Sequence, residues 1–420
     1  MFTTVKILVV GSGAREHALV EALQRFDDEV HAAPGNAGIA REVPVHPLDV
    51  QDATAIADLA EQIAADLVVI GPEIPLVLGA ADAVRARGIA CFGPSAEAAQ
   101  LEGSKAFAKQ VMAAAGVPTA MARVCTTIDE AEQALDSFGA PYVVKDDGLA
   151  AGKGVVVTDD RDAALAHVRA CLDRGEAAAV VIEEYLDGPE VSLFAITDGT
   201  TILPLQPAQD FKRVGDADTG PNTGGMGAYS PLPWAPEGLV DEITERVLQP
   251  TVDAMRAAGT PFSGLLYAGL ALTSRGLRVV EFNARFGDPE TQVVLARLIT
   301  PLAPVLYAAA TGTLGDLPPL HWSPDAAVVV VIAAEGYPGG VTTGDVLTGL
   351  DEAALVPGAR VLHAGTSTGA DDALVSAGGR VLSVVGTGSD LEAARATAYT
   401  AVDRIGLRGS HHRRDIAAGR

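Results

Sequence analysis

Cysteine and paired histidine are scarce in this chain of 420 residues, and both scarcities exclude classes of site. The three cysteines, Cys91, Cys125 and Cys171, are odd in number and far apart, which excludes a disulfide framework and a C-x-x-C metal site. The sequence has no H-E-x-x-H motif, and His411-His412 is its only close histidine pair. A zinc site built from histidine is therefore not expected.

Basic residues are scarce as well: 30 Lys and Arg stand against 54 Asp and Glu, a formal charge of −24. This balance argues against nucleic acid or an anionic membrane as a partner, since both need a basic surface. No apolar run approaches the roughly 20 residues of a membrane helix. With 48% hydrophobic residues, 45 glycines and 25 prolines, the chain is predicted to be globular, loop-rich and cytoplasmic, with several domains.

Lysine is the rarer of the two strong bases, because only six of the 30 basic residues are lysine. Five of the six fall between residues 105 and 212. A lysine retained in a chain that otherwise uses arginine suggests that a compact ammonium is needed, as in phosphate binding. Chance placement on solvated surfaces is the alternative. The six positions are Lys6, Lys105, Lys109, Lys145, Lys153 and Lys212.

The N-terminal part reads as strands that end in glycine-containing turns and alternate with alanine-rich helices. Residues 5–10, 66–70 and 90–92 are predicted strands, and a helix follows Gly13. This order implies a doubly wound α/β sheet with a ligand crevice at the carboxyl ends of its strands. NAD is disfavoured, because the third glycine of G-x-G-x-x-G is replaced by Glu16. The turn instead suits a small phosphorylated ligand at the helix N-terminus.

From residue 103 the pattern changes. We predict a helix to residue 115, strands at 141–145 and 155–157 that form a hairpin with a mobile tip, a helix over 161–175 and a strand over 179–184. A small α/β domain is expected to begin near residue 326, after a proline-rich stretch at 316–324.

The hairpin tip at 147–154 carries a candidate phosphate-binding turn, DGLAAGKG. It is not a Walker loop, because Lys153 is followed by Gly154 where Ser or Thr is required. Its small residues would nevertheless let backbone N–H groups approach phosphate oxygens, and Lys153 would add a point charge. An ordinary glycine hairpin is the alternative.

The end of the strand at 277–282 carries a second candidate, E-x-N-x-R. In an extended segment Glu281, Asn283 and Arg285 lie on one face. A carboxylate and an amide oxygen are ligands that Mg²⁺ prefers beside phosphates, and Arg285 adds fixed positive charge. A strand edge with an internal salt bridge is the alternative. The turn that follows, with Asp288 and Glu290, contains acids that could hold an amine.

The tract 209–230 is polar, glycine-rich and longer than most linkers. It combines acids, bases and a G-G-M-G turn. We expect a lid or floor that binds an anion and an ammonium together, with a plain surface loop as the alternative.

Seven segments, in this order and at these distances, resemble the phosphoribosylamine–glycine ligase family of the ATP-grasp superfamily: GSGAREHAL, PGNAG, GPEIPLV, LEGSKAF, DGLAAGKGVVV, DTGPNTGGMGAYSP and EFNARFGDPETQ. The resemblance covers essentially the whole chain. It implies an ATP-grasp fold with an N-terminal doubly wound substrate domain (1–102), an ATP-grasp domain (103–325) and a small C-terminal α/β domain (326–420). A mobile ATP lid is expected at about 120–190.

The resemblance also implies a reaction and its ligands. ATP would phosphorylate glycine to glycyl phosphate, and 5-phosphoribosylamine would displace phosphate to give glycinamide ribonucleotide. No enzymic nucleophile is needed, because the acyl phosphate carries the activation. Mg²⁺ or Mn²⁺ and a monomeric state are expected.

Site residues follow from the same resemblance. Arg285, Lys145 and Lys105 match catalytic positions, and Glu281 and Asn283 match metal ligands. The nucleotide-binding positions are Lys105, Lys145, Gly152, Lys153, Gly154, Glu183, Glu184 and Glu190. The substrate-binding positions are Gly13, Arg15, Gly35, Asn36, Gly71, Pro72, Glu73, Asp210, Lys212, Asn222, Thr223, Gly225, Met226 and Asp288.

Two departures from the family pattern stand out. Family members usually read K-A-D-G where this chain has Asp146 after Lys145; strand alternation predicts that Asp146 points away from the site. The strand at 265–269 lacks the acid that many ATP-grasp enzymes place there, so a further metal ligand must come from elsewhere. To reconcile a charge of −24 with anionic substrates, we expect the lysines to converge with Arg15, Arg213 and Arg285 on one basic cleft.

Three other functions compete with this interpretation. Another ATP-grasp carboxylate–amine ligase would share the nucleotide site, but GPNTGGMGAYSP and GDPETQ argue against it. A sensor that binds ATP without turnover would not need Arg285. A nicotinamide dehydrogenase is disfavoured by Glu16.

Overall fold

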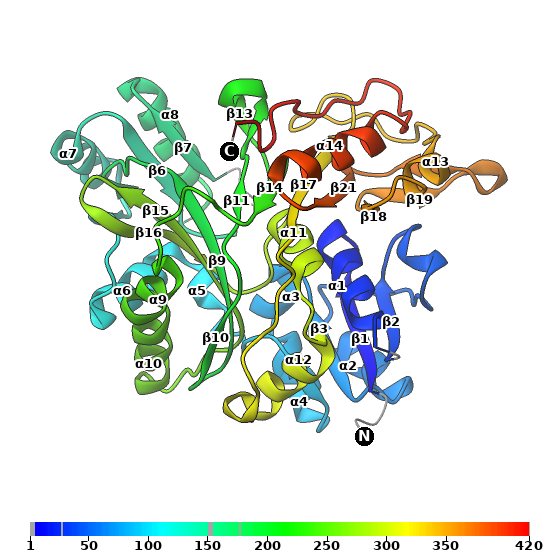
Figure 1. The fold of residues 1–420 in the computed structure, drawn as a ribbon. Coiled ribbons are helices and arrows are strands. Elements are labelled where there is room, and N and C mark those ends of the chain that lie inside the picture. The colour runs from blue at the N-terminus through cyan, green and yellow to red at the C-terminus, as the bar shows by residue number, and fades with distance from the viewer. Residues whose placement is uncertain (1–4, 27, 150–153, 176–177, 420) are drawn as a thin grey trace.

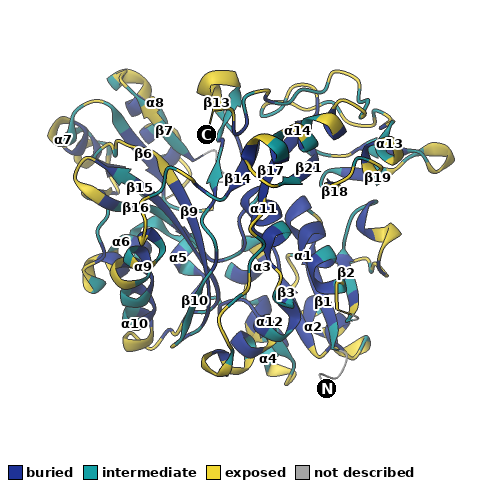
Figure 2. Cartoon of the chain, in the orientation of Figure 1, coloured by how far each residue is buried: buried dark blue, intermediate teal, exposed yellow. Residues whose placement is uncertain are grey.

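Figure 1 shows the chain as a computed structural model, which describes residues 5–26, 28–149, 154–175 and 178–419. The N-terminal part is a four-stranded parallel sheet of order β2-β1-β3-β4. Its central strands are buried on both faces (Figure 2), as expected of a parallel sheet covered by helices. The elements are β1 (Lys6–Gly11), α1 (Ala14–Gln24), β2 (Glu29–Pro34), α2 (Ala53–Gln62), β3 (Leu67–Ile70), α3 (Glu73–Val77), α4 (Ala80–Ala86) and β4 (Ala90–Phe92). The predicted α/β sheet is confirmed.

Two helices lead into a small antiparallel sheet of order β5-β8-β6-β7 with its own core. Ser104 caps the N-terminus of α6, and Gly116, with positive φ, ends it. The elements are α5 (Gln100–Gly103), α6 (Lys105–Ala115), β5 (Ala122–Cys125), α7 (Ile128–Phe138), β6 (Tyr142–Asp146), β7 (Val155–Thr158), α8 (Arg161–Leu172) and β8 (Val180–Glu183). The predicted hairpin is confirmed by the pairing of β6 with β7; residues 150–153 of its tip lie outside the described residues.

A third sheet, antiparallel and of order β10-β9-β15-β16, lies next to the small sheet (Figure 1). The E-x-N-x-R segment stands at the end of its edge strand β16, where Asn283 pairs with Tyr267 of β15. The elements are β9 (Glu190–Asp198), β10 (Ile202–Pro204), α9 (Leu239–Ile243), α10 (Gln249–Ala257), β15 (Ser263–Thr273), β16 (Gly276–Asn283), α11 (Glu290–Arg297) and α12 (Leu302–Thr311).

The fourth large sheet is antiparallel and joins the tract 209–230 to the C-terminal part in the order β11-β14-β17-β21-β18. The tract is therefore not a plain surface loop: β14 is fully buried and pairs with β17. One continuous sheet thus crosses the expected boundary at residues 325 and 326. The elements are β11 (Gln209–Asp210), β12 (Arg213–Gly215), β13 (Thr219–Asn222), β14 (Gly227–Ser230), β17 (Ala326–Ala333), α13 (Leu350–Ala354), β18 (Ala359–His363), β19 (Thr366–Thr368), β20 (Leu374–Ser376), β21 (Arg380–Gly388) and α14 (Leu391–Val402).

No described helix is long and apolar enough to cross a membrane.

Gly225 lies where the tract 209–230 packs against the segment after β16. Its φ is +109°, and a Cβ atom at this position would lie 2.3 Å from Cδ of Pro289. We expect Gly225→Ala to lower the free energy of unfolding by more than the roughly 1 kcal/mol that a positive φ alone costs alanine, because a steric clash adds to the strain. Gly259→Ala is the matched control, since its φ is +84° and nothing lies within 4 Å of the added atom. Equal losses for the two variants in urea unfolding would contradict the clash.

Candidate active site

A cleft of about 500 Å³ lies between the small sheet and the β9–β16 sheet, and the N-terminal turns and β21 complete it. The expectation of a basic cleft is wrong in two respects: acids line the cleft together with the cations, and two of the expected cations, Lys6 and Arg213, are not among its lining residues. Arg213 is not among its lining residues and donates a hydrogen bond to the carbonyl of Gly220. The cations are Arg15, Lys105, Lys109, Lys145, Lys212, Arg285 and Arg380; the acids are Glu73, Glu102, Glu183, Glu184, Glu190, Asp210, Glu281, Asp288 and Glu290.

Glu183 holds two lysines at one wall of the cleft. Its Oε1 lies 2.9 Å from Nζ of Lys109, and its Oε2 lies 2.8 Å from Nζ of Lys145. Burial raises the pKa of the Glu183 carboxyl, but the two ammonium groups outweigh burial and lower that pKa below its usual value. Glu183 is therefore paired with the lysines, and its expected place beside the adenine gains no support. The neighbouring Glu184 instead accepts a hydrogen bond from the backbone N–H of Met121.

Lys105 stands at the first turn of α6 and donates to the carbonyl of Gly148 at 3.0 Å. The Asp147 carboxylate accepts hydrogen bonds from the Ser104 hydroxyl and the Ala106 N–H, both at 3.1 Å. These contacts bind the hairpin of the small sheet to the N-terminus of α6, as an acid at a helix start is expected to do. Gly154 lines the cleft, whereas Gly152 and Lys153 lie outside the described residues.

Arg285 is held by two acids from the N-terminal half of the chain. Its Nη2 lies 2.8 Å from Glu102 Oε1, and its Nε lies 3.2 Å from Glu73 Oε2. Burial opposes the charge of Arg285, but Glu102 and Glu73 more than compensate and raise its pKa. The guanidinium is thus a fixed positive charge at the junction of the N-terminal turns with β16.

Glu281 and Asn283 both line the cleft, as strand alternation predicts. Among the described residues, no hydrogen bond or ion pair engages the Glu281 carboxylate, while the Asn283 amide oxygen has only a 3.4 Å contact with Arg285 Nη2. A carboxylate and an amide oxygen that are not committed elsewhere are the hard donors that Mg²⁺ or Mn²⁺ takes. The two side chains therefore fit a divalent cation.

Asp210 and Lys212 form the opposite wall with Glu190. The Lys212 ammonium contacts the Glu190 carboxylate. Burial disfavours the Lys212 charge, but Glu190 and Asp210 outweigh burial and raise its pKa well above the usual value. Burial raises the pKa of Asp210 to about 7; Lys212 opposes this rise, and the negative charges of Glu290 and Glu190 add to it. The wall thus carries a carboxyl group poised to gain or lose a proton near neutral pH.

A further acid, Asp288, pairs with Arg380 of the C-terminal part, and Arg380 in turn contacts the tract 209–230. Its Oδ2 lies 3.1 Å from Nη2 of Arg380, and Arg380 Nη1 donates to the carbonyl of Gly224 at 2.6 Å. Next to it, the buried Glu290 accepts hydrogen bonds from Tyr267 Oη at 2.6 Å and Ser192 Oγ at 3.1 Å.

The predicted substrate turns of the N-terminal sheet divide into two groups. Arg15 and Glu73 line the cleft, whereas the described lining does not include Gly13, Gly35, Asn36, Gly71 or Pro72. Glu16 explains part of this difference. Its Oε2 accepts the Gly13 N–H at 2.6 Å, and its Oε1 lies 2.6 Å from Nε of Arg15. The acid that replaces the third glycine therefore occupies the turn itself.

Glu16 also leaves no room for a side chain at Gly71, because a Cβ atom there would lie 2.0 Å from Glu16 Oε1. Asn36 is also engaged locally, since its Nδ2 donates to the carbonyls of Ser12 and His363. These two positions thus have structural reasons for their identity that are independent of any substrate.

Only some of the substrate-binding residues predicted in the tract 209–230 line the cleft. Asn222, Thr223, Asp210 and Lys212 line the cleft. Met226 and Gly225 do not line the cleft: Met226 is fully buried in the core, and Gly225 packs against Pro289.

Sequence reasoning gave no site role to three charged residues of the cleft, Lys109, Glu102 and Arg380. Lys109 had a signal, since it belongs to the lysine group between 105 and 212, yet its helical position hid its role. Glu102 lies within the LEGSKAF segment, but nothing in that segment indicated its role. Arg380 had no signal, because the C-terminal part shows no concentrated set of polar groups.

The prediction for Asp146 is confirmed. Its side chain is absent from the described lining of the cleft and pairs with Arg174 on the opposite face of β6. The extra carboxylate therefore does not face the lysine wall.

Comparison with known proteins agrees with this arrangement. The family models for the N domain, the ATP-grasp (A) domain and the C domain of phosphoribosylglycinamide synthetase match residues 5–102, 103–291 and 327–419. The phosphoribosylamine–glycine ligase of Streptomyces coelicolor is 67% identical over 99% of both chains, and that of Mycobacterium tuberculosis is 57% identical over 98% of this chain and 97% of its own. The chain belongs to this family of ligases.

Solved structures agree. The crystal structure of phosphoribosylamine–glycine ligase from Thermotoga maritima superposes with a TM-score of 0.85 at 34% identity, covering 98% of this chain and 100% of the other. A biotin carboxylase from Campylobacter jejuni, at 16% identity and a TM-score of 0.72 over 98% of this chain and 93% of its own, shares the fold. The expected ATP-grasp fold and ligase family are confirmed.

The lysine wall depends on Glu183. We expect Glu183→Gln to lower the free energy of unfolding by about 3–5 kcal/mol, because two buried ammonium groups lose their counter-charge. ATP affinity should fall as well, because no common carboxylate would hold Lys109 and Lys145 in place. Urea unfolding and calorimetric titration of ATP measure both effects. Asp136→Asn, which breaks an exposed pair with Arg161, is the control and should cost about 1 kcal/mol or less. Equal losses in the two variants would refute the role of Glu183.

The carboxyl of Asp210 should make the stability of the ligand-free protein depend on pH. Its folded pKa of about 7 exceeds the unfolded value of 3.8, so between these values the folded state holds a proton that the unfolded state has released. This contribution to stability is complete below pH 4 and is lost as pH rises to 7, by up to about 1.4 kcal/mol per pH unit. Asp210→Asn should lack this slope in unfolding experiments, and the exposed Asp173→Asn should retain it. Parallel curves for wild type and Asp210→Asn would contradict the assignment.

Proposed function

We propose that the chain joins glycine to 5-phosphoribosylamine at the expense of ATP, with glycyl phosphate as the intermediate and glycinamide ribonucleotide, ADP and phosphate as products. The observation that carries this proposal is the position of Arg285. It stands two residues after the oxygen pair of Glu281 and Asn283 and is held by Glu73 and Glu102 from the N-terminal half. A phosphate acceptor and a second substrate can therefore meet at one fixed guanidinium.

In the first step a glycine carboxylate oxygen attacks the γ-phosphorus of ATP, and the bond from that phosphorus to the β–γ bridging oxygen breaks to release ADP. Lys105 and Lys145 lie on the wall where they would neutralise phosphate oxygens, and Arg285 would stabilise the charge on the transferred group. Glu281 and Asn283 would hold Mg²⁺ or Mn²⁺, which supplies charge neutralisation at the phosphates when bound.

In the second step the amine nitrogen attacks the glycyl carbonyl carbon, the carbon–oxygen bond to phosphate breaks, and the amine loses a proton. The chain must hold the glycine ammonium and the ribose phosphate in place. Asp210, Asp288 and Glu290 are the acids suited to the ammonium, and Arg15 with the N-terminal turns is suited to the ribose phosphate.

The remaining assignments belong to the same proposal. Glu184 and Glu190 would contact the adenosine part of ATP. The chain would divide into segments 1–102, 103–325 and 326–420, with residues 120–190 closing over ATP, and it would act as a cytoplasmic monomer.

Phosphate release from ATP tests the proposal. We expect release only when glycine and phosphoribosylamine generated in place are both present, and release should fall to background in Glu281→Ala. The exposed Glu245→Ala is the matched control and should retain activity.

Two outcomes would reject the proposed reaction. Turnover with formate or bicarbonate in place of glycine would point to another ATP-grasp ligase. ATP binding without turnover under any acid and amine would point to a sensor.

A further inference from the structure

The second step of the proposed reaction releases a proton from the attacking amine, so a base in the cleft would speed this step. Such a base works best when its pKa lies near the working pH. The described lining of the cleft contains no histidine and no cysteine. Lysines, tyrosines and carboxylates are therefore the groups to compare.

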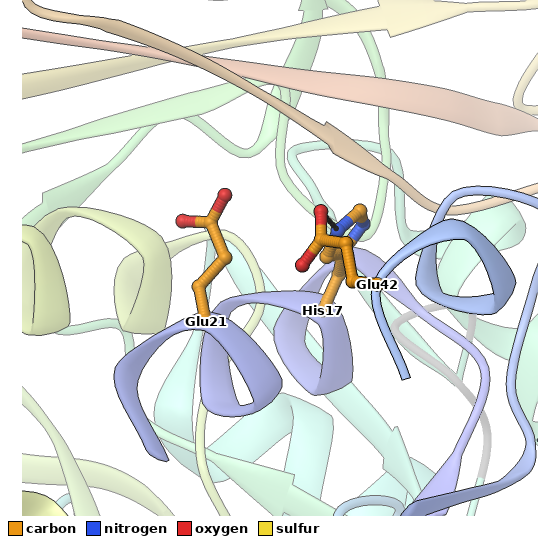
Figure 3. A group of neighbouring side chains, drawn as sticks. All are labelled: His17, Glu21 and Glu42. Carbon is orange, nitrogen blue, oxygen red and sulfur yellow. Dashed lines mark hydrogen bonds and ion pairs between the residues drawn. The ribbon is translucent and has the colours of Figure 1, made fainter. Parts of the chain in front are cut away.

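His17 follows Arg15 by two residues on α1, but its ring is engaged outside the cleft. Figure 3 shows His17 beside Glu42, with Glu21 one turn away on the same helix. The Nδ1 atom of His17 accepts the backbone N–H of His363 at 2.8 Å, and its Nε2 donates to Glu42 Oε1 at 3.0 Å. His17 therefore links α1 to β18 and does not serve the reaction as a base.

The lysines and Tyr267 are poor bases in this cleft. The four lysines of the described lining each donate to an oxygen, and two of them share the Glu183 carboxylate. Burial lowers the pKa of Lys109, but Glu183 opposes this, and the ammonium also donates to two further oxygens. Burial and then the negative charge of Glu290 raise the pKa of Tyr267 well above its usual value, so this phenol keeps its proton.

Most carboxylates of the cleft are held by a hydrogen bond or an ion pair. These contacts stabilise the ionised form and make each carboxylate a weaker base. In the described lining only Glu281 and Asp210 have no such partner, and Glu281 stands beside Asn283 as the proposed ligand of a divalent cation. The engaged acids are Glu73, Glu102, Glu183, Glu184, Glu190, Asp288 and Glu290.

A short strand fixes Asp210 at the wall of the cleft. In the pairing of β11 with β14, Asp210 lies opposite Ala228. Strand alternation turns Phe211 into the core, while Asp210 and Lys212 line the cleft. The Lys212 ammonium contacts Glu190 and makes no ion pair with Asp210. Among the described residues, no other residue donates a hydrogen bond to the Asp210 carboxylate, so its oxygens are open to a donor on a substrate.

The charges around Asp210 suit a group that takes up a proton near neutral pH. Burial raises the pKa of Asp210 to about 7; Lys212 opposes this rise, and Glu290 and Glu190 add to it. Tyr267 on β15 is the further titratable group near this carboxylate, and it stays neutral. A carboxylate of this basicity can accept a proton from an amine and release it to water after the product leaves.

We propose that Asp210 is the general base of the second step. As the amine nitrogen bonds to the glycyl carbonyl carbon and the carbon–oxygen bond to phosphate breaks, the Asp210 carboxylate takes the proton that the nitrogen loses. This role rests on the proposed function. It leaves Asp288 and Glu290 for the glycine ammonium, since a carboxylate can accept several hydrogen bonds.

A rapid-quench single turnover measures the two steps separately, with ATP, glycine and phosphoribosylamine generated in place. The amount of ADP reports the first step, and the amount of glycinamide ribonucleotide reports the second. We expect Asp210→Asn to form ADP within about threefold of the wild-type rate but glycinamide ribonucleotide about 100-fold or more slowly, as loss of a general base implies. Asp210→Glu restores a carboxylate and should recover part of the lost rate.

The exposed Asp241→Asn is the matched control and should form both products at the wild-type rate. Formation of ADP at that rate by Asp210→Asn shows that this variant is folded and binds ATP and glycine. The pH dependence of the wild type is a second measurement, which needs no variant. Formation of glycinamide ribonucleotide should fall about tenfold per pH unit below about pH 7, and ADP formation should not follow it.

Three results would overturn this role of Asp210. Equal slowing of both products in Asp210→Asn would make Asp210 a binding group for ATP or glycine. An unchanged rate of glycinamide ribonucleotide formation in that variant, or a wild-type rate that does not change with pH, would exclude it as the base. Wild-type protein that forms ADP without glycinamide ribonucleotide would instead reject the proposed reaction, and the role of Asp210 with it.

Discussion

Paired burial of opposite charges is the constraint on which the active cleft depends. A chain with more carboxylates than cations must still keep cations in a position where they can contact phosphates. The cleft meets this requirement by giving its buried cations fixed acidic partners, as Glu183 does for Lys109 and Lys145 and as Glu73 and Glu102 do for Arg285. Because a buried charge without a partner is costly, these pairs hold the side chains in one geometry before a substrate arrives.

The same pairs connect distant parts of the chain. Glu73 follows β3 of the parallel sheet, Glu102 lies in α5, and Arg285 follows β16, so one guanidinium links three segments. Asp288 and Arg380 make a similar link to the C-terminal sheet, which the buried strand β14 extends from the tract 209–230. The cleft is therefore a product of the junctions between sheets, and its geometry depends on how these sheets pack.

Local structure follows from local pattern at most positions. Apolar runs ending in turns predict β1, β3 and β4, and Ser104 before an apolar helix predicts the start of α6. Strand alternation also places Glu281 and Asn283 on the cleft side and Asp146 away from Lys145. The tract 209–230 was harder, because its short strands have no internal periodicity and are defined only by their pairing: β12 pairs with β13, and β14 pairs with β11 and with β17.

The sequence by itself determined the family, the order of the elements and most charged residues of the cleft, because motifs and periodicity are local properties. Only the tertiary structure decided which charge faces which. Glu183 neutralises lysines rather than standing free, Glu16 fills the first glycine turn, and Arg380 reaches the cleft from the last sheet. The groups that pair with Glu183 and with Arg380 lie tens of residues away in the chain, so their contact is set by the packing of sheets and is not encoded in the spacing of any one segment.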